Sequence, residues 1–268
     1  MKWLALETST EHVSVAACDG ARESVRDVAG GAQASLTVLP AIEQVLNDLG
    51  LALKDVQAIA FGQGPGAFTG LRTACAVAQG LALGANKPLL AFDSLCLVAQ
   101  SVRQQQTHIK RVLVTLDARM GQVYWGAVEW LSSSHGDPQD LGHWVHVLPI
   151  AVSNPDEVHW PEAWSASDDH TLVAGSWVNA QGEGREQALG PHAWQAARPQ
   201  AQAMLSLAKS AWQRGLALAP EDAAPLYVRN KVAQTTAERA AQNLAQNLAQ
   251  NLSPSAPQSA PQSAGAQP

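Results

Sequence analysis

The sequence predicts an α/β fold that contains two similar units, and three observations support this prediction. Short apolar runs, such as residues 2–6 and 56–61, alternate with stretches of helical periodicity. A pattern of strand, acid, turn and strand occurs twice, because Leu6-Glu7 before Val13 matches Leu116-Asp117 before Val123 at equal spacing. A chain of 268 residues, 46% of them hydrophobic, can build a sizeable core. The duplicated RNase-H-like fold of actin and sugar kinases (the ASKHA fold) has this organisation.

The first predicted subdomain spans residues 1–105. Three strands open it, at 2–6, 13–19 and 22–28, with Asp19-Gly20 as a turn. Apolar residues three and four positions apart from Leu36 to Leu49 then predict a helix that ends at Gly50. The remaining elements are expected in the order strand 56–61, glycine-rich loop, helix 73–82, strand 87–91 and helix 94–104.

The second predicted subdomain spans residues 106–232. Residues 112–127 indicate a strand, an acidic turn and a strand, residues 143–147 a further strand, and residues 201–216 a helix. Residues 233–268 consist mostly of Ala, Gln, Asn, Ser and Pro. Such a tail cannot bury enough apolar surface to offset its ordering entropy, so we expect it to be disordered.

Composition excludes several classes of function. The net charge of −6 and the lack of a basic tract argue against strong autonomous binding to nucleic acid. Three widely spaced cysteines in apolar segments are typical of reduced core residues and form no disulfide framework. Glu7 follows too early for a signal peptide, and no apolar run reaches the ~20 residues of a membrane helix. We therefore expect a cytoplasmic protein without a membrane segment.

The glycine-rich loop at residues 64–72, with glycines at 64, 66 and 70, is the most informative stretch of the chain. Its spacing fits no familiar phosphate loop, because Thr69 stands where a dinucleotide fingerprint has its third glycine. A P-loop would have Lys and Ser or Thr where Leu71 and Arg72 stand. The glycines either relieve a tight turn or allow close approach of another backbone, a ligand or a partner. Arg72 opposes the helix dipole, so we expect it to meet a carboxylate or an anion.

The positions that bind nucleotide in actin-like ATPases are altered in this chain. Glu7 stands for the usual Asp, and Ser9 for the glycine that lets the backbone reach phosphate. Asp117 keeps the acid of the second hairpin without its glycine, and Gly175 stands where such folds place a glycine against the nucleoside. We expect this degenerate site to bind ATP weakly or not at all, so no cofactor is assigned to the chain alone.

No catalytic residue and no metal site are predicted. His143 and His146 are three positions apart on an expected strand, where such residues face opposite sides. The sequence contains no His-x-x-x-His, and its cysteines lack the spacing of a zinc site. No nucleophile elbow is present either.

Four ordered motifs carry a resemblance to a known family. The first two are Leu4-Ala5-Leu6-Glu7-Thr8-Ser9-Thr10 and Gly64-Pro65-Gly66-Ala67-Phe68-Thr69-Gly70-Leu71-Arg72. The other two are Leu116-Asp117-Ala118-Arg119-Met120-Gly121-Gln122-Val123-Tyr124 and Pro225-Leu226-Tyr227-Val228-Arg229-Asn230. Over roughly residues 1–232 the chain resembles the TsaB (YeaZ) family of bacterial tRNA-modification subunits.

The resemblance implies a two-subdomain, actin-like subunit that is not itself the catalyst. Such proteins pair with TsaD, which transfers a threonylcarbamoyl group to the adenosine next to the anticodon of tRNAs that read ANN codons. The ATPase TsaE joins them, ATP is used by the complex, and tRNA is contacted only through the complex.

By the same resemblance, the first amphipathic helix and the helix after the loop form the pairing surface, in a heterodimer or a homodimer. The implied interface residues are Leu39, Ile42, Gly64, Pro65, Gly66, Phe68, Thr69, Gly70 and Arg72. The chain departs from the family at Ala34-Ser35, where a histidine often precedes the helix. The alternative function is a stand-alone actin-like ATPase or kinase. A glycoprotease of the M22 type lacks its metal ligands here.

Overall fold

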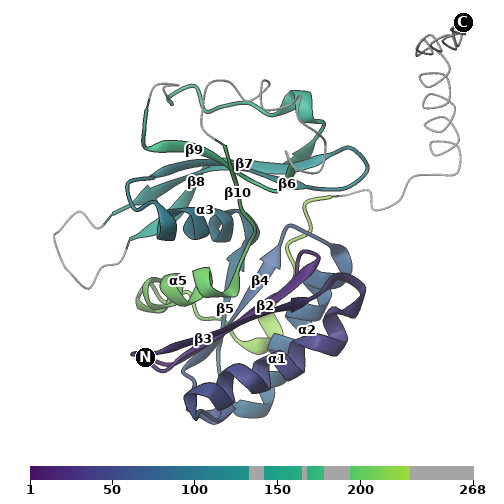
Figure 1. Ribbon diagram of the computed structural model, residues 1–268, viewed down its shortest axis with the longest axis vertical. Coiled ribbons are helices and arrows are strands. Elements are labelled where there is room, and N and C mark those ends of the chain that lie inside the picture. Colours follow the sequence, from purple (N-terminus) through teal and green to yellow (C-terminus); the bar gives the residue numbers. More distant parts are fainter. Residues whose placement is uncertain (133–141, 165–167, 178–193, 230–268) are drawn as a thin grey trace, which may run out of the picture. The chain divides into compact units, whose positions relative to one another are not determined.

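The structure is a computed structural model that describes residues 1–132, 142–164, 168–177 and 194–229 (Figure 1). Residues Met1–Val228 form one compact unit. The predicted tail at 233–268 lies outside the described residues. Among the described residues, no helix is both long and apolar enough to cross a membrane.

The first half of the chain forms a five-stranded sheet in the order β3-β2-β1-β4-β5. Its central strand β1 (Trp3–Glu7) runs antiparallel to β2 (His12–Cys18), which pairs antiparallel with β3 (Glu23–Ala29). On its other side β1 runs parallel to β4 (Ala58–Gly64), which in turn runs parallel to β5 (Leu89–Asp93).

The second sheet repeats this plan strand for strand. Its order is β10-β9-β6-β7-β8, with β6 (Arg111–Asp117) antiparallel to β7 (Val123–Leu131) and β7 antiparallel to β8 (His143–Ser153). Strand β6 runs parallel to β9 (Thr171–Gly175), and β9 runs parallel to β10 (Trp194–Ala196). Equal order and equal strand directions confirm the predicted duplicated, actin-like α/β fold.

The register refines the predicted match between the two halves. Glu7 and Asp117 both end the central strand of their sheets. However, Glu7 pairs with Ser14 whereas Asp117 pairs with Val123. The second hairpin is therefore one residue shorter, and Val123 corresponds to Ser14 instead of Val13.

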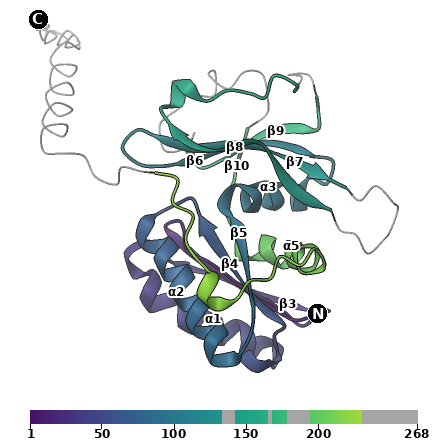
Figure 2. The same cartoon turned by 180° about the vertical axis from the view of Figure 1, so that it is seen from behind.

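Two helices cover one face of the first sheet (Figures 1 and 2). Helix α1 (Ala34–Leu49) ends at Gly50, as the sequence predicted, and Gly50 adopts the left-handed conformation. Helix α2 (Phe68–Ala85) begins five residues before the predicted start at 73, because the Leu71 amide already donates to the Ala67 carbonyl. Half of the glycine-rich loop is thus the first turn of a helix.

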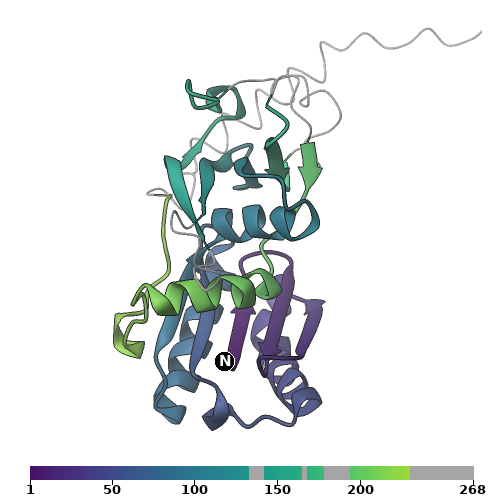
Figure 3. The ribbon, with the colours of Figure 1, turned by 90° about the vertical axis from the view of Figure 1, so that its left-hand side faces the viewer.

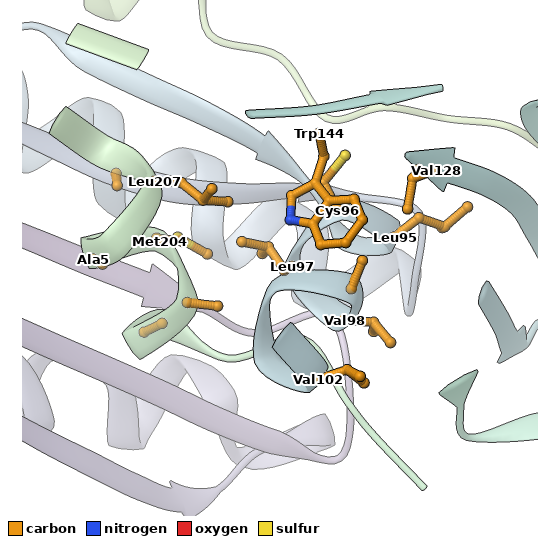
Figure 4. Packing of buried hydrophobic residues seen from close by; sticks show 14 of the residues in the cluster. Ala5, Leu95, Cys96, Leu97, Val98, Val102, Val128, Trp144, Met204 and Leu207 are labelled. Atoms are coloured by element: carbon orange, nitrogen blue, oxygen red, sulfur yellow. The ribbon is translucent and has the colours of Figure 1, made fainter. Parts of the chain in front are cut away.

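Helices α3 (Ser94–Gln105) and α5 (Ala201–Gln213) lie between the two sheets (Figure 3). Helix α3 contacts β4 and β5 of the first sheet and β6, β7 and β9 of the second. Its apolar side chains share one core with residues from both sheets and from α5 (Figure 4). Leu97, Val98 and Val102 have no exposed surface at all.

The opposite face of the second sheet packs against tryptophans. Leu113, Val123 and Trp125 of the strands contact Trp164 and Trp177 from the connections. Short 3-10 turns complete the described elements, at Gly31–Gln33, Leu53–Asp55, Pro155–Glu157 and Pro220–Asp222.

The chain crosses back to the first sheet near its C-terminal end. Helix α5, which the sequence places in the second subdomain, packs on β1 and β2. Leu218 then forms an isolated bridge with Leu89, and the Leu226 amide donates to the Gln63 carbonyl at 2.7 Å. The fourth sequence motif therefore lies beside the glycine-rich loop.

Candidate functional site

The first hairpin holds the glycine-rich loop directly. The Thr8 hydroxyl donates to the Gly70 carbonyl at 2.6 Å, and the Ala67 amide donates to the Ser9 carbonyl at 2.8 Å. Since the Ala67 amide is engaged in this way, it is not free for an anion at the start of α2. The loop fixes the chain's own hairpin to the first turn of the helix.

Each glycine of the loop has a structural reason within the chain. A Cβ atom at Gly66 would lie 2.5 Å from the Ser9 Cβ, and one at Gly70 would lie 1.9 Å from the Thr8 carbonyl oxygen. Gly64 has a φ of +110°, in the region that glycine favours. The backbone that Gly66 and Gly70 accommodate belongs to the same chain, and partner contact by the three glycines and the buried Pro65 stays a prediction.

Arg72 meets an aromatic pair and not the expected carboxylate or anion. Its guanidinium carbon lies 3.8 Å from the centre of the Phe68 ring, a cation–π contact. Its Nε donates to the Tyr227 hydroxyl at 3.0 Å, and the Phe68 and Tyr227 rings lie 5.4 Å apart. Phe68, Thr69 and Arg72 are exposed, so they remain available to a partner.

The two helical residues predicted for pairing have opposite environments. Leu39 is 50% exposed, whereas Ile42 is 4% exposed and packs in the core against the first sheet. Ile42 is thus corrected to a core residue, since α1 turns that face of the helix inward.

The exposed sides of α1 and α2 carry several apolar and small residues, which we call the α1–α2 face. Leu36 and Leu83 are 74% and 64% exposed. Apart from the helix's own backbone, no atom of the described residues lies within 4 Å of the position that a Cβ would take at Gly80. The face consists of Leu36, Leu39, Phe68, Ala76, Gly80 and Leu83. The sequence did not single out Leu36 and Leu83 as exposed, because helical periodicity does not tell which apolar residues a helix leaves outside.

A pocket of about 340 Å³ lies where the two hairpins meet. Ser9, Asp117 and Ser176 line it, together with Arg119 and Arg198. An ion pair between Glu11 and Arg119 joins the first hairpin to the second. The Asp117 amide donates to the Ser176 hydroxyl at 3.2 Å. Of the three positions predicted for the degenerate nucleotide site, Asp117 lines this pocket, whereas Glu7 and Gly175 are not among the residues that line it.

The residues at this site do not fit a magnesium–nucleotide group. Glu7 is 1% exposed, and the structure does not place it among the residues that line the pocket. Its Oε1 accepts the Ser9 amide at 2.5 Å, while its Oε2 has no hydrogen-bond partner among the described residues. A Cβ at Gly62 would lie 1.8 Å from that Oε2, so the carboxyl points into the sheet.

Gly175, the third nucleotide-site position, packs against the backbone of Thr115 and does not line the pocket. A Cβ there would lie 1.8 Å from the Thr115 carbonyl oxygen. Gly175 therefore lets β9 approach β6, and Ser176 rather than Gly175 lines the pocket. We derive no chemical step through a nucleotide.

We expect Glu7→Gln to change how stability depends on pH. Burial raises the pKa of Glu7 above its ordinary value of 4.5, despite hydrogen bonds from Ser9 that act in the other direction. Between these two pKa values the folded chain keeps a proton on Glu7 that the unfolded chain releases. The contribution of Glu7 to folding stability is therefore fully present below pH 4.5, and it is lost as pH rises through the pKa of Glu7 in the folded state. Glutamine does not titrate. The melting temperature of Glu7→Gln relative to wild type should therefore rise between pH 4.5 and pH 8.

Circular dichroism melts at several pH values check this prediction. The matched control is Glu43→Gln on α1, which makes the same change from carboxylate to amide at an exposed position. If the difference in melting temperature between Glu7→Gln and wild type did not change with pH, the buried Glu7 carboxyl would not make stability depend on pH.

Known proteins resemble this chain over most of its length. A family model described as "TsaD: tRNA N6-adenosine threonylcarbamoyltransferase" matches residues 31–139. The tRNA threonylcarbamoyladenosine biosynthesis protein TsaB of Escherichia coli K12 is 33% identical over 87% of this chain and 96% of that protein. TsaB of Haemophilus influenzae is 32% identical over 85% of this chain and 94% of that protein.

A solved structure agrees with these sequence relatives. YeaZ from Pseudomonas aeruginosa superposes with a TM-score of 0.72 at 37% identity, covering 84% of this chain and 99% of that chain. The relatives of comparable length and this structure show that the chain belongs to the TsaB (YeaZ) family of tRNA threonylcarbamoyladenosine biosynthesis proteins.

Proposed function

We propose that this chain is a non-catalytic subunit that pairs with TsaD and activates it in threonylcarbamoyl transfer to tRNA. Family membership supports the pathway. The misfit of Glu7 and Gly175 to a magnesium–nucleotide group supports a role without chemistry of its own. In this proposal TsaE joins the pair, ATP is used by the complex, and the product is the modified adenosine next to the anticodon of tRNAs that read ANN codons.

The observation that carries the pairing proposal is the α1–α2 face. Exposed leucines at 36 and 83 lie on neighbouring helices, and Ala76 and Gly80 allow another backbone to come close. Monomeric soluble proteins rarely leave such apolar helix faces open to water, and interface cores are enriched in apolar contacts.

The kinship with TsaD favours TsaD as the occupant of this face. The matched segment, residues 31–139, includes both helices of the face. Two related subunits that pair through equivalent helices form a near-symmetric interface, in which each surface complements its counterpart. The same geometry would let two copies of this chain pair through the same face when TsaD is absent.

Contact with tRNA would come only through the complex. A net charge of −6 with 15% charged residues does not favour binding of the chain alone to the negatively charged phosphate backbone of RNA. We place the complex in the cytoplasm, where tRNA is modified.

Leu83→Asp tests the pairing. We expect it to weaken binding to TsaD of the same organism by about 30-fold or more, because a charge would be buried against the apolar surface of the partner. Isothermal titration calorimetry on the full-length proteins measures this loss. Leu216→Asp is the matched control, since Leu216 is also exposed, at 49%, but lies after α5. Its affinity should equal that of wild type.

Equal affinities for the two variants would contradict the proposed face. Analytical ultracentrifugation of the chain alone distinguishes homodimers from monomers. We expect Leu83→Asp to shift the monomer–dimer equilibrium toward the monomer. Robust ATP hydrolysis by the purified chain without partners would contradict the non-catalytic role and favour a stand-alone ATPase.

A further inference from the structure

Three side chains that could ligate a metal ion converge at the junction of the two sheets. Asp93 ends β5 and caps α3, with its Oδ1 accepting the Cys96 amide at 2.9 Å. Cys96 lies in the first turn of α3 and is labelled in Figure 4, where its sulfur is yellow. His146 comes from β8 of the second sheet. One ligand atom from each of the three lies within 4.8 Å of the other two.

The distances between these atoms resemble the edges of a tetrahedral site. His146 Nε2 lies 3.2 Å from Asp93 Oδ2 and 3.8 Å from Cys96 Sγ. Zinc bonds of ~2.0–2.3 Å in tetrahedral geometry place neighbouring nitrogen, oxygen and sulfur ligands roughly 3.3–3.6 Å apart. These two distances differ from such edges by a few tenths of an ångström, and the third pair of ligand atoms lies within 4.8 Å.

The arrangement does not match a catalytic triad. In a triad the carboxylate and the nucleophile contact opposite nitrogens of the imidazole. Here Asp93 and Cys96 both approach Nε2 of His146. Burial also raises the pKa of the Cys96 thiol well above its usual range, and the Asp93 carboxylate adds to this effect. A protonated thiol is a poor nucleophile.

A pocket adjoins the cluster and leaves room for a further ligand. It has a volume of about 240 Å³, and Asp93, Cys96 and His143 are among its lining residues. Water can complete the coordination from this side, as in zinc sites with three protein ligands. A thiolate, a carboxylate and a neutral imidazole together carry the two negative charges that balance a divalent cation.

We propose that Asp93, Cys96 and His146 bind one divalent transition-metal ion, with Zn²⁺ the best match to a thiolate–imidazole–carboxylate set. Binding breaks the Cys96 S–H bond, forms a sulfur–metal bond and releases the proton to solvent. The ion ties β5 and the start of α3 to β8, and so joins the two halves of the fold. The sequence predicted no metal site because the third ligand, His146, lies 50 positions after Cys96.

Cobalt titration of the full-length, metal-free protein tests the site. We expect one Co²⁺ per chain, a sulfur-to-cobalt charge-transfer band in the near ultraviolet, and displacement of Co²⁺ by Zn²⁺. Cys96→Ser should abolish the band. Cys75→Ser should retain it, because Cys75 is also buried but contacts the Ala223 carbonyl. This readout is independent of TsaD, so failure of the site and failure of the proposed pairing are distinguishable.

His146→Gln is the second variant, because His146 is exposed on β8 and its replacement should leave the fold intact. Loss of an outer-shell partner alone costs ~10–100-fold in metal affinity, so we expect loss of this ligand to cost more than about 100-fold. Zn²⁺ should raise the melting temperature of wild type but not that of either ligand variant. A missing charge-transfer band in wild type, a band that persists in Cys96→Ser, or an unchanged affinity in His146→Gln would overturn the proposal.

Discussion

Gly70→Ala is expected to destabilise the protein by more than about 3 kcal/mol, although alanine favours helices more than glycine does. The added Cβ would lie 1.9 Å from the Thr8 carbonyl oxygen, a backbone atom that cannot rotate away. The Thr8 hydroxyl also donates to the Gly70 carbonyl, so relief of the clash would break this bond. For a unit of this size the loss corresponds to roughly 6–12 °C in melting temperature.

Gly80→Ala on the same helix is the matched control, and its effect should have the opposite sign. Outside α2 itself, the part of the chain that the structure describes places no atom within 4 Å of the Cβ position at Gly80, so the substitution adds no clash there. We expect a gain of about 0.5–1 kcal/mol from the lower conformational entropy of the unfolded chain. Urea unfolding of the two variants measures both effects, and equal effects would contradict the close contact between Gly70 of α2 and the first hairpin.

The glycines of the loop show which contacts could be predicted from the sequence and which could not. Three glycines within seven positions predicted that something approaches the loop closely, and Gly66 and Gly70 confirm that it does. The sequence did not show that the approaching group is the hairpin at Thr8 and Ser9. Such a contact joins segments that are distant along the chain, and local patterns carry no information about it.

Periodicity predicted the elements better than it predicted their surroundings. The repeat of strand, acid, turn and strand led to the correct duplicated fold, because Glu7 and Asp117 end equivalent strands. Spacing of apolar residues also located α1. It could not separate the exposed Leu39 from the buried Ile42, since both fit the same helical period and only the packed sheet decides between them.

The Asp93–Cys96–His146 cluster could not be predicted from the sequence for a related reason. Sequence searches for metal sites depend on ligands at short, fixed spacing. Here β5 and α3 supply two ligands, and the fold brings the third from an edge strand of the other sheet. Only the duplicated topology, with α3 between the sheets, brings these residues together.

Leu97→Ala is expected to destabilise both halves of the molecule together. Leu97 is fully buried on α3, in the core that residues of both sheets share (Figure 4). Truncation of a buried leucine costs about 2–5 kcal/mol, depending on how far the cavity collapses. Because α3 contacts strands of each sheet, neither half can keep its packing when this core is disrupted. We therefore expect one cooperative transition at a lower urea concentration.

Two probes test whether that transition is shared. Far-ultraviolet circular dichroism depends strongly on α1 and α2 of the first half, whereas tryptophan fluorescence depends strongly on the cluster around Trp125, Trp164 and Trp177 of the second. The two curves should coincide in wild type and shift together in Leu97→Ala. Leu131→Ala, at a side chain that is 45% exposed, should change stability by no more than about 0.5 kcal/mol. If only one probe shifted in Leu97→Ala, the halves would unfold independently, and α3 would belong energetically to one sheet alone.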